Sequence, residues 1–124
     1  VIAIFCGKIL SGDAPVIYGD GTQTRDYIYV QDVVRAQLAA ARSEAIGEIN
    51  IGTGVATSVL GLVDVMRELQ PDAAASFVPE FAPERLGEIQ ESLLDISRAK
   101  ELLGWEPETT LLDGMRATLE AAPV

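Results

Sequence analysis

Apolar residues recur at helical spacing in five segments of the chain, and shorter apolar runs lie between them. The clearest amphipathic pattern predicts a helix from Thr57 or Ser58 to about Leu69, with one buried face. The residues of that face stand at i, i+3, i+4 and i+7 spacing: Val59, Leu62, Val63, Met66 and Leu69. The other helices are predicted over residues 1–10, 33 to about 42–44, 96–103 and 111–121.

Polar residues at the ends of these segments are typical helix caps. Asp32 is the predicted N-cap of the second helix and Asp95 that of the fourth. Thr110, with Asp113 three residues later, resembles a capping box for the fifth. Glycines that are expected to end helices are Gly12, Gly47 and Gly104.

Short runs of β-branched and aromatic residues predict strands over residues 15–18, 27–30, 48–51 and 75–78. Residues 92–94 are a further short extended piece, and residues 79–87, with two prolines, are expected to form a loop. Strands that alternate with helices indicate an α/β fold with helices packed on short, partly parallel strands. The helix over residues 33–42 is apolar around most of its circumference, so we expect neighbours to cover it on more than one side.

Composition fits one globular domain or a piece of a larger one: 124 residues, 48% of them hydrophobic and 23% charged. No apolar run approaches the roughly 20 residues that a bilayer span needs. The single cysteine excludes a disulfide framework, and a chain without histidine has no imidazole for acid–base or metal chemistry. The sequence therefore predicts no metal site and a cytoplasmic protein.

The net charge of −10 argues against nucleic acid and anionic membranes as partners. Any anionic ligand would need cations gathered locally, so each well-placed arginine is informative. The chain also begins in mid-pattern at Val1–Phe5, which favours a fragment of a longer protein over a processed mature N-terminus.

The segment Tyr18–Asp26 combines a glycine-containing turn with candidate ligand-binding groups. Arg25 offers a bidentate fork for phosphate or carboxylate, Gln23 an amide and Tyr18 an aromatic face. An anion over this turn is one interpretation. The residues alone favour the other, a hairpin in which Arg25 pairs with Asp20 or Asp26.

Four other features are weaker candidates for a functional site. Arg85, in a loop, reads as a solvated charge when taken alone, and the carboxylates Glu84 and Glu88 are too unspecific to predict a metal. Cys6 is expected to be an inert core thiol. The G-x-G turn at residues 52–54 lacks the third glycine and the later acidic residue of a dinucleotide fingerprint, so we interpret it as structural.

Taken together, the segments resemble the C-terminal part of the extended short-chain dehydrogenase/reductase family. They are most similar to NAD-dependent nucleotide-sugar epimerases and dehydratases of the UDP-glucose 4-epimerase kind. The segments that carry the resemblance run in family order over nearly the whole chain: residues 15–36, 50–54, 57–59, 85–89 and 94–107.

The resemblance implies a nucleotide-sugar site. It therefore replaces the interpretations of Arg25 as an internal ion-pair partner and of Arg85 as a solvated charge. Both guanidinium groups would flank the diphosphate of a UDP- or TDP-sugar. The remaining implied substrate-binding residues are Val16 and Tyr18 at the base, Glu88 at the ribose and Gln23 near the nucleotide. The family's arginine is often followed by proline, and Leu86 stands there instead, which loosens the loop.

The family's catalytic parts are not in this sequence. No tyrosine is followed four residues later by lysine, and no G-x-x-G-x-x-G turn is present. The resemblance therefore implies NAD as cofactor of a parent enzyme, a missing N-terminal Rossmann domain against which residues 31–54 pack, and an inactive fragment with no cofactor of its own. It also allows a homodimer. The alternatives are a 4,6-dehydratase or decarboxylase relative, or a stand-alone non-catalytic binding or assembly module.

Overall fold

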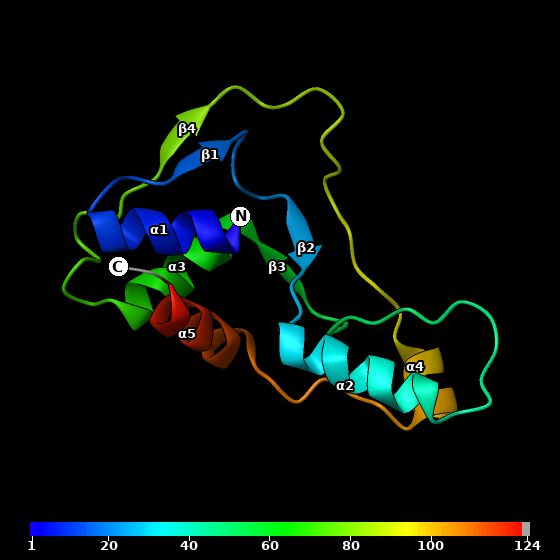
Figure 1. Cartoon of the computed structure of the whole chain (residues 1–124). Coiled ribbons are helices and arrows are strands. Elements are labelled where there is room, and N and C mark those ends of the chain that lie inside the picture. The colour runs from blue at the N-terminus through cyan, green and yellow to red at the C-terminus, as the bar shows by residue number, and fades with distance from the viewer. Residues whose placement is uncertain (123–124) are drawn as a thin grey trace.

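The computed structural model describes residues 1–122 and has helices and short strands in alternation, so the predicted α/β class is confirmed (Figure 1). The helices are α1 Ile2–Ser11, α2 Val30–Ala41, α3 Val59–Leu69, α4 Ser97–Leu103 and α5 Leu111–Ala121. The strands are β1 Val16–Tyr18, β2 Thr24–Asp26, β3 Ala56–Ser58 and β4 Glu80–Ala82.

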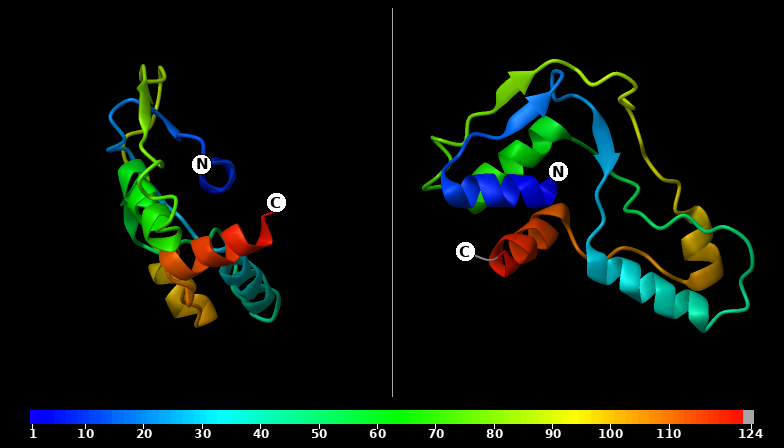
Figure 2. Two further views of the ribbon diagram at one scale, coloured as in Figure 1. Left: turned by 90° about the vertical axis from the view of Figure 1, so that its left-hand side faces the viewer. Right: turned by 45° about the horizontal axis from the view of Figure 1, so that its top comes forward.

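The main core lies where α1, α3 and α5 meet beneath β1 (Figure 2). Helix α3 supplies the face predicted from its spacing, with Leu62, Val63 and Met66 almost fully buried. Phe5 of α1 packs edge-on against Phe77, with ring centroids 6.2 Å apart. The three helices are joined to the strands through Ile17 of β1, which is buried in this core, and through the contact of α3 with β3.

A second, smaller core joins α2 to α4 on the other side of the molecule (Figure 1). Ala36 packs there with Ala99 and Trp105. The indole N–H of Trp105 donates to the backbone oxygen of Asp32, which is itself only 1% exposed. The Asp32 carboxylate accepts from Arg35 and from the N–H groups of Glu108 and Thr109, so it ties α2 to the segment that leads into α5.

The strands form two small pairs. β1 and β4 are parallel, with Ile17 opposite Phe81, and β2 and β3 are antiparallel, with Arg25 opposite Thr57. The outer edge of β2 is also used: the Thr24 N–H donates to the Gln90 oxygen and the Ser92 N–H donates to the Thr24 oxygen. The long segment between β4 and α4 therefore runs beside β2, as Figure 1 shows.

Three of the predicted strands are wrong. Residues 27–30 do not form one, because the chain pairs three residues earlier, in β2, where β3 is available as a partner. Residues 48–51 are irregular, and residues 75–78 form tight turns in which the Ser76 and Phe77 N–H groups donate to Ala73. The parallel partner of β1 is instead β4, inside the predicted loop of residues 79–87.

The helix predictions hold, apart from the start and the end of α2. Gly47 does not end this helix: α2 stops at Ala41, and the Arg42 and Ser43 N–H groups close its last turn onto Ala39 and Ala40. Ser58 and Thr110 cap α3 and α5 through their side chains, and Gly12 and Gly104 end α1 and α4 in the left-handed conformation. Asp32 is not the N-cap of its helix: α2 begins at Val30, and Asp32 lies in its first turn. The N-cap of α4 is Ile96 and not Asp95. Asp95 lies one residue earlier, and its carboxylate accepts a hydrogen bond from the Ser97 N–H.

Among residues 1–122, helix α2 is covered on one side only. Its contact with α4 buries Ala36, whereas Val30, Val34 and Leu38, spaced four residues apart, are 46–64% exposed. Whether residues 31–54 face another domain stays a prediction. Within residues 1–122, no helix is both long and apolar enough to cross a bilayer.

Replacing Asp32 by Ala is expected to lower the free energy of unfolding by about 2–3 kcal/mol, because two backbone N–H groups lose a buried acceptor. Burial, the largest single influence, would raise the pKa of Asp32, but hydrogen bonds from Arg35, Thr109 and Glu108 together lower it. The carboxylate's contribution is therefore full above the unfolded pKa of about 3.9 and fades as the pH falls below it. Urea unfolding at neutral and acid pH measures this; an equal loss at both would contradict it.

The apolar stripe on α2 predicts that the chain self-associates and binds the dye ANS. A Val34→Lys/Leu38→Lys variant should bind less dye and elute later on size exclusion, with unchanged unfolding. A wild-type chain that is a monodisperse monomer, binds no dye and melts sharply would refute this prediction.

Candidate functional site

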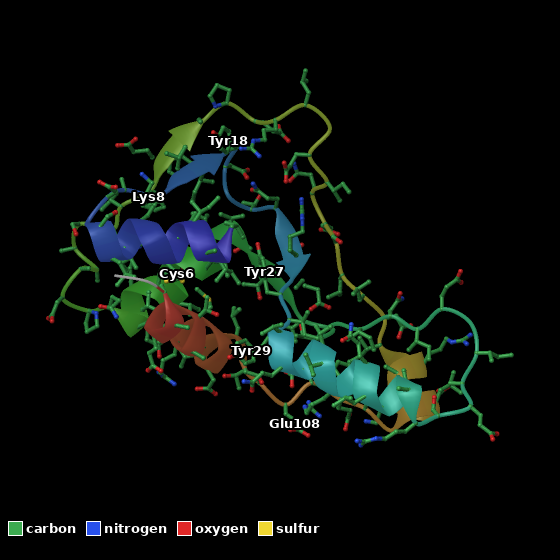
Figure 3. All side chains as sticks on the ribbon, in the orientation of Figure 1. Cys6, Lys8, Tyr18, Tyr27, Tyr29 and Glu108 are labelled. Carbon is green, nitrogen blue, oxygen red and sulfur yellow. The ribbon has the colours of Figure 1, made fainter. Side chains whose placement is uncertain are left out.

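One pocket, of about 210 Å³, is lined by all six residues that sequence analysis proposes for ligand binding. They come from four separate parts of the chain: β1, the turn after it, β2 and the loop after β4. Those residues are Val16, Tyr18, Gln23, Arg25, Arg85 and Glu88. The remaining lining, which sequence reasoning missed, is mostly apolar: Val1, Phe5, Ile17, Tyr27 and Val59. All of these except Val1 belong to the main core or pack against it. Figure 3 labels Tyr18 and Tyr27.

Arg25 is held by the strand pairing around it. Its guanidinium donates to the Glu88 carboxylate and to the Thr24 backbone oxygen, both at 2.7 Å. The ion pair with Glu88 is three-quarters buried, which separates it from ordinary surface pairs. Neither Asp20 nor Asp26 is the partner of Arg25, so the hairpin pairing that the residues alone favoured is wrong.

Arg85 reaches the same pocket from the opposite loop. Its guanidinium carbon lies 3.9 Å from the centre of the Tyr18 ring, a cation–π contact. The backbone places it through a turn in which the Glu88 N–H donates to the Arg85 oxygen. Gly87, with a φ of 79°, takes the third position of that turn, where a positive φ is required.

Gln23 forms the wall between this pocket and a second, polar one. Its side chain is nearly buried, and its amide N–H donates to the Tyr18 backbone oxygen at 2.9 Å, which fixes the amide's orientation. The neighbouring pocket, of about 280 Å³, shares Tyr18, Gln23 and Glu88 and adds the carboxylates of Asp20 and Glu84. Two arginines therefore line the pocket on one side of the Gln23 amide, and the carboxylates of Asp20 and Glu84 line the pocket on its other side.

Charge in the main pocket is opposite to that of the whole chain. Two arginines and one glutamate line it, in a protein whose net charge is −10. Burial, the largest influence, raises the pKa of Tyr27, so this lining residue keeps its proton at neutral pH. The arrangement suits an anion that two guanidinium groups can contact from different loops.

Asp26, beside Arg25, makes contacts that the sequence did not indicate. Its carboxylate accepts from the Thr53 N–H and hydroxyl and from the Gly54 N–H, at 2.5–2.9 Å. A Cβ on Gly52 would lie only 2.6 Å from its Oδ2, so glycine is needed there for close approach. The sequence feature that could have indicated these contacts is the G-x-G turn at residues 52–54.

This geometry also decides what the G-x-G turn can hold. The N–H groups that would contact a cofactor phosphate already donate to an internal carboxylate. The turn therefore does not fit a dinucleotide, in agreement with its structural interpretation.

The other candidates lie outside the pocket or have partners. Cys6 is a buried core thiol whose pKa is raised chiefly by burial. Glu84 accepts from Gln90, and within residues 1–122 no group of three potential ligands is placed to hold a metal ion. A larger pocket, of about 720 Å³, lies elsewhere, is mostly apolar and is lined by α1, α5 and the start of α2.

The chain is thus an α/β unit with one pocket that two arginines and one glutamate line. The sequence matches the family model described as GDP-mannose 4,6 dehydratase over residues 1–118. The chain belongs to this family, and the resemblance to extended short-chain dehydrogenases/reductases is confirmed.

Similar proteins are sugar-nucleotide enzymes that are longer than this chain. A UDP-glucose 4-epimerase of Mycolicibacterium smegmatis is 42% identical over 97% of the chain, which spans 38% of that enzyme. The structure of a Thermotoga maritima UDP-glucose 4-epimerase with UDP-glucose has a TM-score of 0.88 and 41% identity, over 96% of this chain and 38% of that one. A Bacillus cereus UDP-glucuronic acid 4-epimerase, solved with UDP-glucuronic acid and NAD, has a TM-score of 0.87 and 32% identity, with the same two coverages.

Leu86→Pro is expected to raise the free energy of unfolding by about 0.4–1 kcal/mol. Leu86 occupies the second position of the Arg85–Glu88 turn, which favours proline, and its side chain is fully exposed. Urea unfolding measures the change, with Leu86→Ala as the control for loss of the side chain. A destabilised proline variant would mean that the loop does not form this turn.

Proposed function

We propose that this chain forms the substrate-binding part of an NAD-dependent sugar-nucleotide epimerase of the UDP-glucose 4-epimerase kind, and that its pocket binds the UDP moiety. The observation that carries the proposal is the convergence of Arg25 and Arg85 on one pocket from different loops. A diphosphate carries about two negative charges, and each charge-assisted hydrogen bond to it contributes about 1.5–3 kcal/mol.

The apolar residues that line the pocket support a nucleoside beside the diphosphate. Val16 and Tyr18 alternate with buried Ile17 on β1, so both side chains face away from the core and line the pocket. In the proposal they contact the base, Glu88 accepts from a ribose hydroxyl while it keeps Arg25 in place, and Gln23 lies close to the nucleotide. TDP is the alternative nucleotide.

The proposal assigns the redox and proton chemistry to residues outside this chain. The hydride chemistry would be supplied by NAD when it is bound in the parent enzyme. The G-x-G turn at residues 52–54 does not suit that cofactor. We therefore expect the 124-residue chain alone to bind nucleotide and to interconvert no sugar. A cytoplasmic location and a homodimer are further proposals, and both concern the parent enzyme.

A second candidate is a 4,6-dehydratase, favoured by the description of the matching family. Both enzymes would need the same diphosphate contacts, so the pocket does not separate them. Product analysis of the parent does: an epimerase gives an isomeric UDP-sugar, whereas a dehydratase gives a 4-keto-6-deoxy sugar.

Arg25→Ala and Arg85→Ala are each expected to weaken UDP binding by about tenfold or more, because each removes a charge-assisted contact. Isothermal titration calorimetry of the chain with UDP measures this. Arg116→Ala is the matched control: its guanidinium pairs with Asp113 on α5, away from the pocket, so it removes the same charge without touching the site.

Two results would refute the proposal. One is a wild-type chain that does not bind UDP. The other is UDP binding that survives both pocket substitutions, or that the Arg116 control weakens equally, since either would reduce the effect to net charge.

A further inference from the structure

We propose that Asp26 is a positioning residue for the diphosphate site: it fixes the backbone of β2 so that the neighbouring Arg25 points into the pocket. This inference rests on the proposed function. Asp26 does not line the pocket, and the ion-pair partner of Arg25 is Glu88. Asp26 would therefore act on Arg25 only through the backbone of β2.

The strand that carries Arg25 is short and needs support on both sides. β2 has three residues, and its ladder with β3 has only three pairs, a size that is marginal on its own. Before Arg25, the backbone of Thr24 bonds to Gln90 and Ser92. After Arg25 the ladder stops at Asp26, and residues 27–29 are irregular.

The Asp26 carboxylate supplies the missing support at that end. Three donors from Thr53 and Gly54 converge on it, so a turn of the kind that binds external anions is occupied by an internal one. Successive strand residues point to opposite faces, so Arg25 lines the pocket while Asp26 reaches back to the turn. A binding group of this kind stays in place only when its supporting contacts do.

Electrostatics and positioning predict opposite signs for the loss of this charge. A carboxylate near a diphosphate repels it, so Asp26→Asn should tighten UDP binding if only charge mattered. If Asp26 positions Arg25, the same substitution should weaken UDP binding by about fivefold or more, since at least one charge-assisted bond to the turn is lost.

Gly52→Ala tests the same contact without changing charge. The new Cβ would meet Asp26 Oδ2 at 2.6 Å and the side chain of Leu94 at 2.9 Å, so the carboxylate must move. Glu84→Gln is the electrostatic control: it removes one negative charge beside the neighbouring pocket and should leave UDP binding unchanged or slightly tighter.

The experiment is calorimetry of the 124-residue chain and these variants with UDP, together with titration of uridine followed by NMR. Uridine lacks the diphosphate, so a positioning role predicts weaker UDP binding by Asp26→Asn and Gly52→Ala, with uridine binding kept within about twofold. The Arg25 Nε–Hε resonance, assigned by its loss in Arg25→Ala, should also shift in both variants without ligand.

The outcomes separate the two proposals. A wild-type chain that does not bind UDP refutes the proposed function and this inference with it. If wild type binds UDP and Arg25→Ala weakens that binding as proposed, three results refute the positioning role alone. They are that Asp26→Asn binds UDP as well as or better than wild type, that the Arg25 resonance stays in place, or that UDP and uridine binding weaken together as a loss of fold would produce.

Discussion

The pocket depends on how a three-residue strand is paired. β2 has β3 on one edge and residues 90–92 on the other, and this double pairing brings Glu88 beside Arg25 although 63 positions separate them in sequence. The loop after β4 that continues into residues 90–92 also carries Arg85 to the ring of Tyr18. If β2 lost either partner, the two guanidinium groups would no longer face the same space.

The two arginines gather positive charge in one pocket of a chain whose net charge is negative. The net charge of −10 repels anions at long range, but at physiological salt that field is screened within about 8 Å. Within the pocket, the Glu88 carboxylate neutralises part of Arg25 and fixes its direction. The Glu88 carboxylate thus weakens the attraction of Arg25 for an anion, but it also fixes the position of the guanidinium group.

The helices could largely be predicted from the sequence, because their signals are local. The spacing of Leu62, Val63 and Met66 and the caps at Ser58 and Thr110 need no knowledge of the rest of the chain. The strands could not, since a three-residue strand exists only through its partner. Residues 27–30 look like a strand by composition, yet hydrogen bonding selects Thr24–Asp26, and β4 forms in a segment that reads as a loop.

The same distinction applies to the site. Residue types and family resemblance indicated Arg25, Arg85 and their four companions, and the structure places all six in one pocket. The partners of these groups depend on tertiary contacts: Arg25 pairs with distant Glu88, and Asp26 bonds to the G-x-G turn rather than to its neighbour. Arg85 interacts with an aromatic ring, a contact that sequence spacing does not indicate.

A crystal structure of the chain with UDP would show whether the two arginines bind the diphosphate. We expect diphosphate oxygens within about 3 Å of the guanidinium nitrogens of both Arg25 and Arg85, with the base against β1. A UDP molecule bound elsewhere, or one whose diphosphate contacts neither arginine, would contradict it.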